Sequence, residues 1–259
     1  MSRAAFYVQR EGRFEPLVPA TGSWNRSHQN GVAVGGLLAR AIEATPVPAP
    51  MVTARLTVDI MRPVPFQPVE ARARVLRETA RMQVLESEIV VDDVVLARAR
   101  ALRLREEPTP PAVEPPLPLP FPEDLPPVPV TSVLGRGHPM ETQVVSGDPR
   151  QPGPGAYWTR FNADLVAGEA LGGCARAVMA ADIASAPSSV LDRKAWSFAN
   201  VDLSVHFTRA PEGEWVLIAC ETVTDGNGVA LVNSVVSDRT GPFGRAHQTL
   251  FIAPLPPKG

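Results

Sequence analysis

The alternation of apolar and polar positions predicts two groups of short strands. The first group lies near residues 52–61, 69–78, 83–91 and 94–104, and the second near residues 156–161, 201–207, 214–223, 229–237 and 245–252. In residues 71–75, for example, Ala and Arg alternate, which indicates one buried and one solvated face. Turn residues at 225–228 and at Gly241-Pro242 separate strands of the second group. Each group is typical of an antiparallel sheet.

Two segments break this period and predict helices. Residues 31–44 and 165–185 are small and apolar on nearly every side, and Pro46 and Pro48 end the first of them. A helix of that composition has to be enclosed by other elements. We therefore expect each antiparallel sheet to curl around one central helix.

The second half of the chain repeats the first. The segment from Leu56 to Pro63 reappears from Leu203 to Ala210, a shift of 147 (203 − 56), with apolar and polar positions in the same order. Copies of this length are too long for solenoid units and predict two similar small domains. Arg62 and Arg209 occupy equivalent places in the two copies, which favours hydrogen bonding at a strand end over contact with a phosphate.

A proline-rich segment predicts the boundary between the domains. Residues 107–130 contain a dense run of prolines with Leu117, Leu119 and Phe121 between them. Proline lacks the donor that a sheet requires, and the interspersed apolar residues indicate a strap that lies on a surface. We expect domains over residues 1–106 and 131–259, joined by this linker.

Composition narrows the class of protein. The chain has 259 residues, is 44% hydrophobic, and carries a formal net charge of −2 without a dense Lys/Arg cluster, so nucleic acid is not an expected partner. No apolar stretch approaches membrane-spanning length and no export signal is apparent. The two cysteines, Cys174 and Cys220, suit a reducing compartment, and we expect a cytoplasmic protein. The histidines lack metal-ligand spacing, so no metal is expected.

The order of elements and several short segments resemble the TesB-like double-hotdog acyl-CoA thioesterases. The resembling segments are residues 22–25, 37–41, 61–63, 181–182, 197–203 and 244–251. The resemblance implies an α+β double-hotdog fold, with two antiparallel sheets each curled around a central helix. It also implies an acyl-CoA substrate, no separate cofactor and assembly into a homo-oligomer.

The same resemblance implies a catalytic set of Asp182, Asn200 and Gln248. Asn200 stands where the family has Thr or Ser, and Asn30-Gly31 stands where related sequences carry His-Gly. In the implied mechanism, Asp182 deprotonates a water that attacks the thioester without a covalent intermediate. Asn200 and Gln248 orient that water or the carbonyl, and helix N-terminal amides stabilise the oxyanion.

Taken alone, these residues leave other interpretations open. Asp182 at a helix end suits exposure to solvent, and Asn200 suits a turn, with Asp202 as a rival candidate. Gln248 lies between Ala246 and Leu250 on an apolar face, but a register shift of one would turn it outward.

Two further functions compete with hydrolysis. A non-catalytic acyl-ligand binder would keep the cleft, and a hotdog enoyl-CoA hydratase would need a His-Gly pair without a clear counterpart here. Cys174 is better explained as a small buried hydrophobe than as a nucleophile. When the two copies are aligned, Ala101 falls at the position of Gln248, so we expect one active site per chain, mainly from the second half.

Overall fold

The computed structural model of the chain describes residues 3–23, 25–110, 120–125, 139–148, 151–192 and 194–255. The elements of the first half are β1 (Ala4–Arg10), β2 (Arg13–Pro16), α1 (Gly31–Glu43), β3 (Met51–Ile60), β4 (Glu70–Glu78), β5 (Met82–Val91) and β6 (Val94–Arg105). The elements of the second half are β7 (Met140–Ser146), β8 (Gly155–Phe161), β9 (Ala163–Val166), α2 (Gly173–Asp182), β10 (Trp196–Asn200), β11 (Asp202–Phe207), β12 (Val216–Thr224), β13 (Val229–Asp238) and β14 (Gly241–Pro254).

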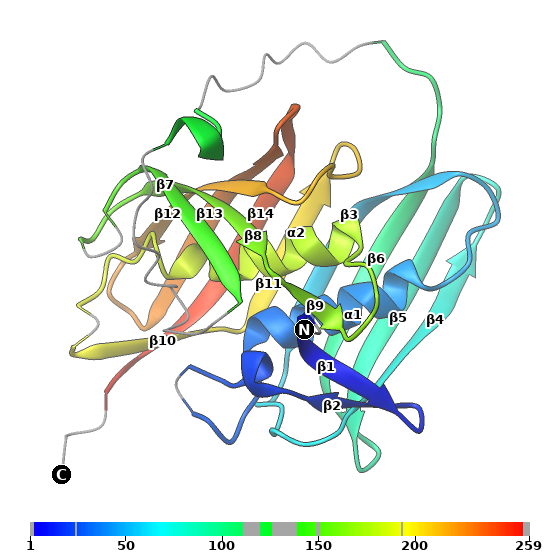
Figure 1. Cartoon of the computed structure of the whole chain (residues 1–259), viewed down its shortest axis with the longest axis horizontal. Helices are drawn as coiled ribbons and strands as arrows, with labels where there is room; N and C mark the ends of the chain where they lie inside the picture. The colour runs from blue at the N-terminus through cyan, green and yellow to red at the C-terminus, as the bar shows by residue number, and fades with distance from the viewer. Residues whose placement is uncertain are drawn as a thin grey trace.

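The two predicted sheets are joined edge to edge into one continuous sheet. Its strand order is β4-β5-β6-β3-β11-β14-β13-β12-β8-β7, with β10 paired to β14. The joint is the antiparallel ladder between β3 and β11, one strand from each half. Both helices lie on the same side of this sheet (Figure 1). The predicted double-hotdog architecture is confirmed.

The helices pack directly against each other, as their small residues predict. A methyl group placed on Gly36 of α1 would lie 2.7 Å from Cγ of Met179 on α2 and 3.1 Å from Cδ1 of Leu165. Only glycine permits this close approach without a shift of the neighbours. Most residues of both helices are fully buried. Among the described helices, none is long and apolar enough to cross a membrane.

The prediction of a helix over residues 165–185 was wrong at its start. Leu165 and Val166 belong to β9, which pairs in parallel with β1, and α2 begins only at Gly173. Gly168 has a φ of +79°, a conformation that interrupts a helix. The sheet β2-β1-β9 was not predicted either; it ties the start of the chain to the second half.

The strands of the two halves pair in the same hydrogen-bond registers. Thr57 faces Arg100 in the first half, and Ser204 faces His247 in the second. Each residue of the second pair lies 147 positions after its counterpart in the first pair (204 − 57; 247 − 100). The irregularity after Ile89 in the β5–β6 ladder recurs after Val236 in the β13–β14 ladder, again 147 positions later (236 − 89). The copies therefore correspond residue by residue along these strands.

Only parts of the predicted linker fall within the described residues. Residues 111–119 and 126–130 lie outside them. Phe121 packs against Trp158 with ring centroids 6.0 Å apart, and the Trp158 indole N–H donates to the carbonyl of Pro120 at 2.8 Å. This described stretch lies on the protein surface, as the prediction of a strap required.

Candidate active site

Asp182 is the last residue of α2 and is half-buried, and its carboxyl group lies against Gly31 of the first half. Burial raises its pKa from the ordinary 3.8 to about 6, although a hydrogen bond from Asn200 acts in the opposite direction. Desolvation penalises the ionised form, and one donor does not offset it. A carboxylate with a raised pKa is a stronger base than an exposed one and is still ionised at neutral pH.

Asn200 ends β10 and turns toward Asp182. Its amide nitrogen donates to the backbone oxygen of Asp182 at 2.8 Å and to the carboxylate Oδ1 at 2.9 Å. One side chain thus holds both the end of α2 and its carboxylate. The rival residue Asp202 has a different role, because its Oδ1 accepts the backbone N–H of Thr249 at 2.5 Å.

Gln248 lies on the inner face of β14, as the period-two pattern predicted. The residue is 2% exposed, and its amide nitrogen donates to the backbone oxygen of Ala181 at 2.7 Å. Ala181 directly precedes Asp182. Asp182, Asn200 and Gln248 therefore come together at the C-terminal end of α2.

Two acceptors at this place have no donor among the described residues: Oδ1 of Asn200 and Oε1 of Gln248. The nitrogens of both amides are already engaged, which fixes the orientation of the two groups. A buried acceptor without a partner is costly. A donor from solvent or substrate would satisfy these atoms.

The first half of the chain contributes the N-terminus of α1. A methyl group on Gly31 would lie 2.8 Å from Oδ1 and 2.9 Å from Oδ2 of Asp182. Asn30 caps the helix by accepting the N–H of Ala33 at 2.8 Å, while its amide nitrogen donates to the carbonyls of Pro19 and Thr21. The N–H groups of Gly31 and Val32 have no acceptor within the helix, as is general for a first turn.

A mirror arrangement exists at the other ends of the helices. Glu43, the last residue of α1, accepts the backbone N–H groups of Cys174 at 2.8 Å and Ala175 at 3.2 Å at the start of α2. Burial raises the pKa of Glu43, and these two backbone donors lower it in part. Arg103 donates to the carbonyl of Ile42 at 2.6 Å, as Gln248 does to Ala181. Here the carboxylate is occupied by protein donors, so the second constellation is structural.

The sequence did not reveal two contacts between the helices, one at each end of the pair. Gly31 and Glu43 each contact the opposite helix, and such contacts depend on how the halves dock. The only signal in the sequence is that an acidic residue ends each apolar helix. Cys174 is buried and its pKa is raised well above its ordinary value by burial, which does not favour a nucleophile. Among the described residues, no group of three or more His, Cys, Asp or Glu side chains is placed to hold a metal ion.

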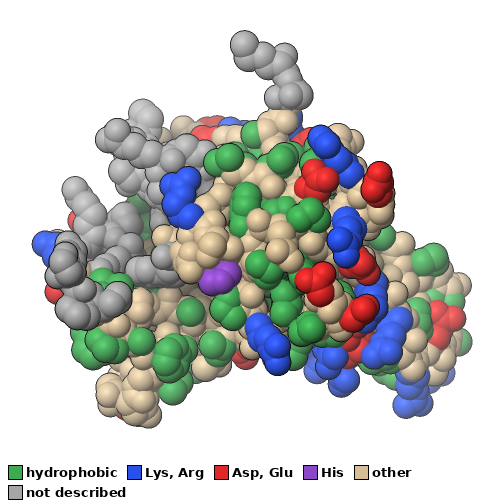
Figure 2. Space-filling view, turned by 90° about the horizontal axis from the view of Figure 1, so that it is seen from below, with side chains coloured by type: hydrophobic (Ala, Val, Ile, Leu, Met, Phe, Trp, Pro, Cys, Tyr) green, Lys and Arg blue, Asp and Glu red, His purple; other side chains and the backbone are tan. Residues whose placement is uncertain are grey.

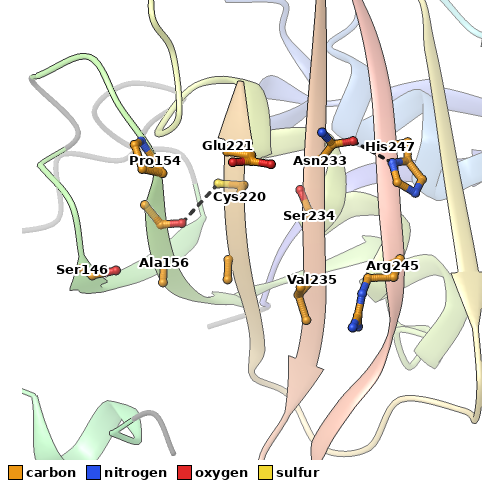
Figure 3. A pocket seen from close by; sticks show the side chains of 12 residues that line it. Ser146, Pro154, Ala156, Cys220, Glu221, Asn233, Ser234, Val235, Arg245 and His247 are labelled. Carbon is orange, nitrogen blue, oxygen red and sulfur yellow. Dashed lines mark hydrogen bonds between the residues drawn. The ribbon is translucent and has the colours of Figure 1, made fainter. Parts of the chain in front are cut away.

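A shallow depression with a volume of about 460 Å³ lies elsewhere, over strands β8, β12, β13 and β14 (Figure 3). His247 and Asn233 meet there at 3.0 Å. Because neighbouring residues of a strand point to opposite faces, His247 lies on the outer face while Gln248 lies on the inner one. The depression is therefore not part of the site at Asp182.

Comparisons with known proteins agree with the fold and with the order of the two halves. Residues 20–104 match the model of an acyl-CoA thioesterase N-terminal domain, and residues 114–252 match that of an acyl-CoA thioesterase C-terminal domain. A comparison with curated proteins found no match.

Solved structures resemble the chain over nearly its whole length. A tesB protein of Mycobacterium avium subspecies paratuberculosis has a TM-score of 0.68 at 19% identity, covering 95% of this chain and 96% of the other. A hot dog fold protein of unknown function from Alicyclobacillus acidocaldarius has a TM-score of 0.74 at 16% identity, covering 96% of both chains. An acyl-CoA thioesterase II, TesB2, from Mycobacterium marinum has a TM-score of 0.67 at 16% identity, covering 87% and 91%.

Proposed function

The chain belongs to the acyl-CoA thioesterase family, and we propose that it hydrolyses an acyl-CoA to a free acid and coenzyme A with water activated at Asp182. The residue assignment is supported by the meeting of three side chains at the end of α2. Asn200 donates to the Asp182 carboxylate, and Gln248 donates to the backbone oxygen of the preceding residue, Ala181. The reaction needs no separate cofactor. Assembly into a homo-oligomer and a cytoplasmic location also belong to this proposal.

The proposed reaction begins with one water molecule. Its hydrogens point to the Asp182 carboxylate and to Oε1 of Gln248 or Oδ1 of Asn200, which leaves an oxygen lone pair free to attack the thioester carbonyl. Asp182 accepts one proton as the carbon–oxygen bond forms. The tetrahedral intermediate then expels the coenzyme A thiolate, and the proton held by Asp182 passes to the sulfur. The carboxylate is restored without a covalent enzyme intermediate.

The start of α1 is the proposed oxyanion site. Its first N–H groups and the positive end of the helix dipole lie next to the Asp182 carboxylate, because Gly31 permits the close approach. Negative charge that develops on the carbonyl oxygen would be stabilised by donors already in place. Attacking and stabilising groups thus come from opposite halves of the chain.

The test is the release of free thiol from acyl-CoAs of increasing chain length. We expect hydrolysis by the wild type and a loss of about a hundredfold or more in kcat for Asp182→Asn and Gln248→Ala. Asp225→Asn, an exposed turn residue, is the matched control and keeps full activity. Tight acyl-CoA binding without turnover would identify a non-catalytic binder. Full activity of a folded Asp182→Asn variant would refute the assignment of the base.

A further inference from the structure

Arg62 differs from its internal counterpart in the partners of its side chain. In the second half, Arg209 donates to both carboxylate oxygens of Asp238 at 2.6 Å each and packs over the ring of Phe243. The equivalent positions in the first half are Val91 and Leu96 (238 − 147; 243 − 147). Among the described residues, Arg62 therefore has neither a carboxylate nor an aromatic ring as a partner.

The backbone of Arg62 is nevertheless held as in the second copy. The N–H groups of Met61 and Arg62 both donate to the carbonyl of Leu96, at 3.1 and 3.0 Å, and the corresponding Thr208 N–H donates to Phe243 at 2.8 Å. The strand end is thus anchored in both copies, and only the side-chain partners have changed. A guanidinium on an anchored backbone and without a counter-ion is available to an external anion.

Four other arginines of the first half lie on the sheet surface and are engaged in ion pairs. Arg72, Arg74, Arg98 and Arg100 form ion pairs with Glu86 and Glu88 on the outer face of β4, β5 and β6. These side chains form a closed network around two carboxylates that are nearly buried. Their charges are satisfied within the sheet, whereas Arg62 has no ion pair with any residue that the structure describes.

Arg62 lines an open, shallow hollow of about 520 Å³ at the end of the first-half sheet, which is called the Arg62 cavity below. Its lining combines Arg62, His28, Gln67 and Asp92 with an apolar wall of Pro63, Pro65, Val91, Val94 and Leu96. The turn between β5 and β6 and the segment after β3 lie on the lower side of Figure 1. Figure 2 faces that side, where basic and acidic side chains alternate beside an apolar centre. The cavity thus offers a cation, hydrogen-bonding groups and an apolar wall.

Two chain segments connect this cavity with the candidate active site. His28 lies three residues before Gly31, roughly 10 Å of extended chain. On the other side, the N–H of Ile60 donates to the carbonyl of Val201 at 3.0 Å, so the strand that leads to Arg62 touches the residue after Asn200. When a thioester lies at Asp182, its coenzyme A carrier can therefore reach this cavity.

We propose that the cavity at Arg62 binds the phosphorylated nucleotide end of coenzyme A, with Arg62 holding a phosphate. This inference rests on the proposed function. Valine and leucine side chains suit the faces of the adenine ring, while Asp92 and Gln67 suit ribose hydroxyls or the exocyclic amine. The two halves then divide the substrate, with chemistry at the end of α2 and carrier recognition on the first half.

The experiment compares acyl-CoA with the matching acyl-pantetheine, which carries the same thioester without phosphates or nucleotide. We expect Arg62→Ala to raise KM for acyl-CoA about tenfold, since it removes a charge-assisted hydrogen bond, while KM for acyl-pantetheine and kcat for both stay unchanged. Val91→Asp gives Arg62 a partner like that of Arg209 and is expected to raise KM for acyl-CoA in the same way. Arg77→Ala, another exposed arginine of the first half, is the matched control.

Direct titration with free coenzyme A separates this inference from the proposed function, because it needs no turnover. Weaker binding of coenzyme A to Arg62→Ala, with no change for pantetheine, supports the cavity even if hydrolysis is absent. Equal effects of Arg62→Ala on both thioesters and on both free thiols would overturn it, and so would unchanged binding in a folded variant. A salt-dependent KM for acyl-CoA that becomes less salt-dependent in Arg62→Ala adds support.

Discussion

Thr57 and Ser204 meet across the centre of the molecule, where their hydroxyl oxygens lie 2.9 Å apart. They face each other in the β3–β11 ladder and are also equivalent positions of the internal repeat. The approximate twofold axis that relates the halves therefore passes through this pair. On either side of it, Leu56 faces Val205 and Val58 faces Leu203.

A double-mutant cycle tests whether this pair stabilises the junction. We expect Thr57→Val and Ser204→Ala each to lower the free energy of unfolding, because each leaves the other hydroxyl without its partner. The double variant is expected to lose less than the sum, with a coupling of about 0.5–1.5 kcal/mol. Denaturant unfolding measures all four proteins. Strictly additive changes would mean that the two hydroxyls do not depend on each other.

If Asp182 is the base as proposed, its pKa sets the pH dependence of hydrolysis. Since burial holds that pKa at about 6, the carboxylate is protonated below pH 6 and cannot accept a proton from water. We expect kcat/KM to rise with pH through about 6 and to level off above it. Initial rates with one acyl-CoA at constant ionic strength provide the profile. A rise centred near pH 4 would contradict the burial of this group.

Gly31→Ala tests the contact between the halves. An added methyl group would sit within 2.9 Å of both carboxylate oxygens of Asp182 and displace this carboxylate, the proposed base. We expect a large loss of kcat, about tenfold or more, although alanine favours a helix over glycine by roughly 0.5–1 kcal/mol. Gly35→Ala is the matched control, because its methyl meets Cγ1 of Val178 at 3.2 Å, away from Asp182. Equal activities of the two variants would argue against a role for this contact.

Glu43→Ala tests the mirror constellation. The change removes the acceptor of the Cys174 and Ala175 N–H groups and leaves the start of α2 uncapped, so we expect a loss of about 1–2 kcal/mol in the free energy of unfolding. KM and kcat of the folded enzyme should change little. Glu106→Ala, at an exposed position, controls for the loss of charge. A loss of turnover without a loss of stability would instead indicate a second catalytic centre.

The sequence predicted the parts of the site that depend on local pattern. Gln248 points inward because side chains alternate along its strand. The ladder registers agree with the alignment in which Ala101 is the equivalent of Gln248 in the first copy. Asn200 is predicted as a site residue only by the family resemblance, because an Asn before a strand is also typical of a turn. The predicted helix over residues 165–185 is longer than α2 because Leu165 and Val166 share the apolar composition of α2, although they belong to β9.

The contacts between the two halves could not be predicted from local patterns in the sequence. The closeness of Gly31 to Asp182, and of Glu43 to the start of α2, results from the packing of two helices through small residues. The equivalence of Arg62 and Arg209 in the repeat suggested a shared role, yet within the described part of the chain Arg209 has a carboxylate partner and Arg62 has none. That difference depends on Asp238 and Val91, which lie 29 residues beyond each arginine (238 − 209; 91 − 62).

Because the β3–β11 ladder joins the two halves within one chain, assembly of the candidate site does not depend on protein concentration. Groups on both sides of the candidate site are carried by one polypeptide, so their meeting is an intramolecular event governed by an effective concentration, not by the amount of protein in solution. Dilution alone does not separate Asp182 from Gly31. Specific activity per chain is expected to stay constant at concentrations where an enzyme built from two separate subunits would dissociate.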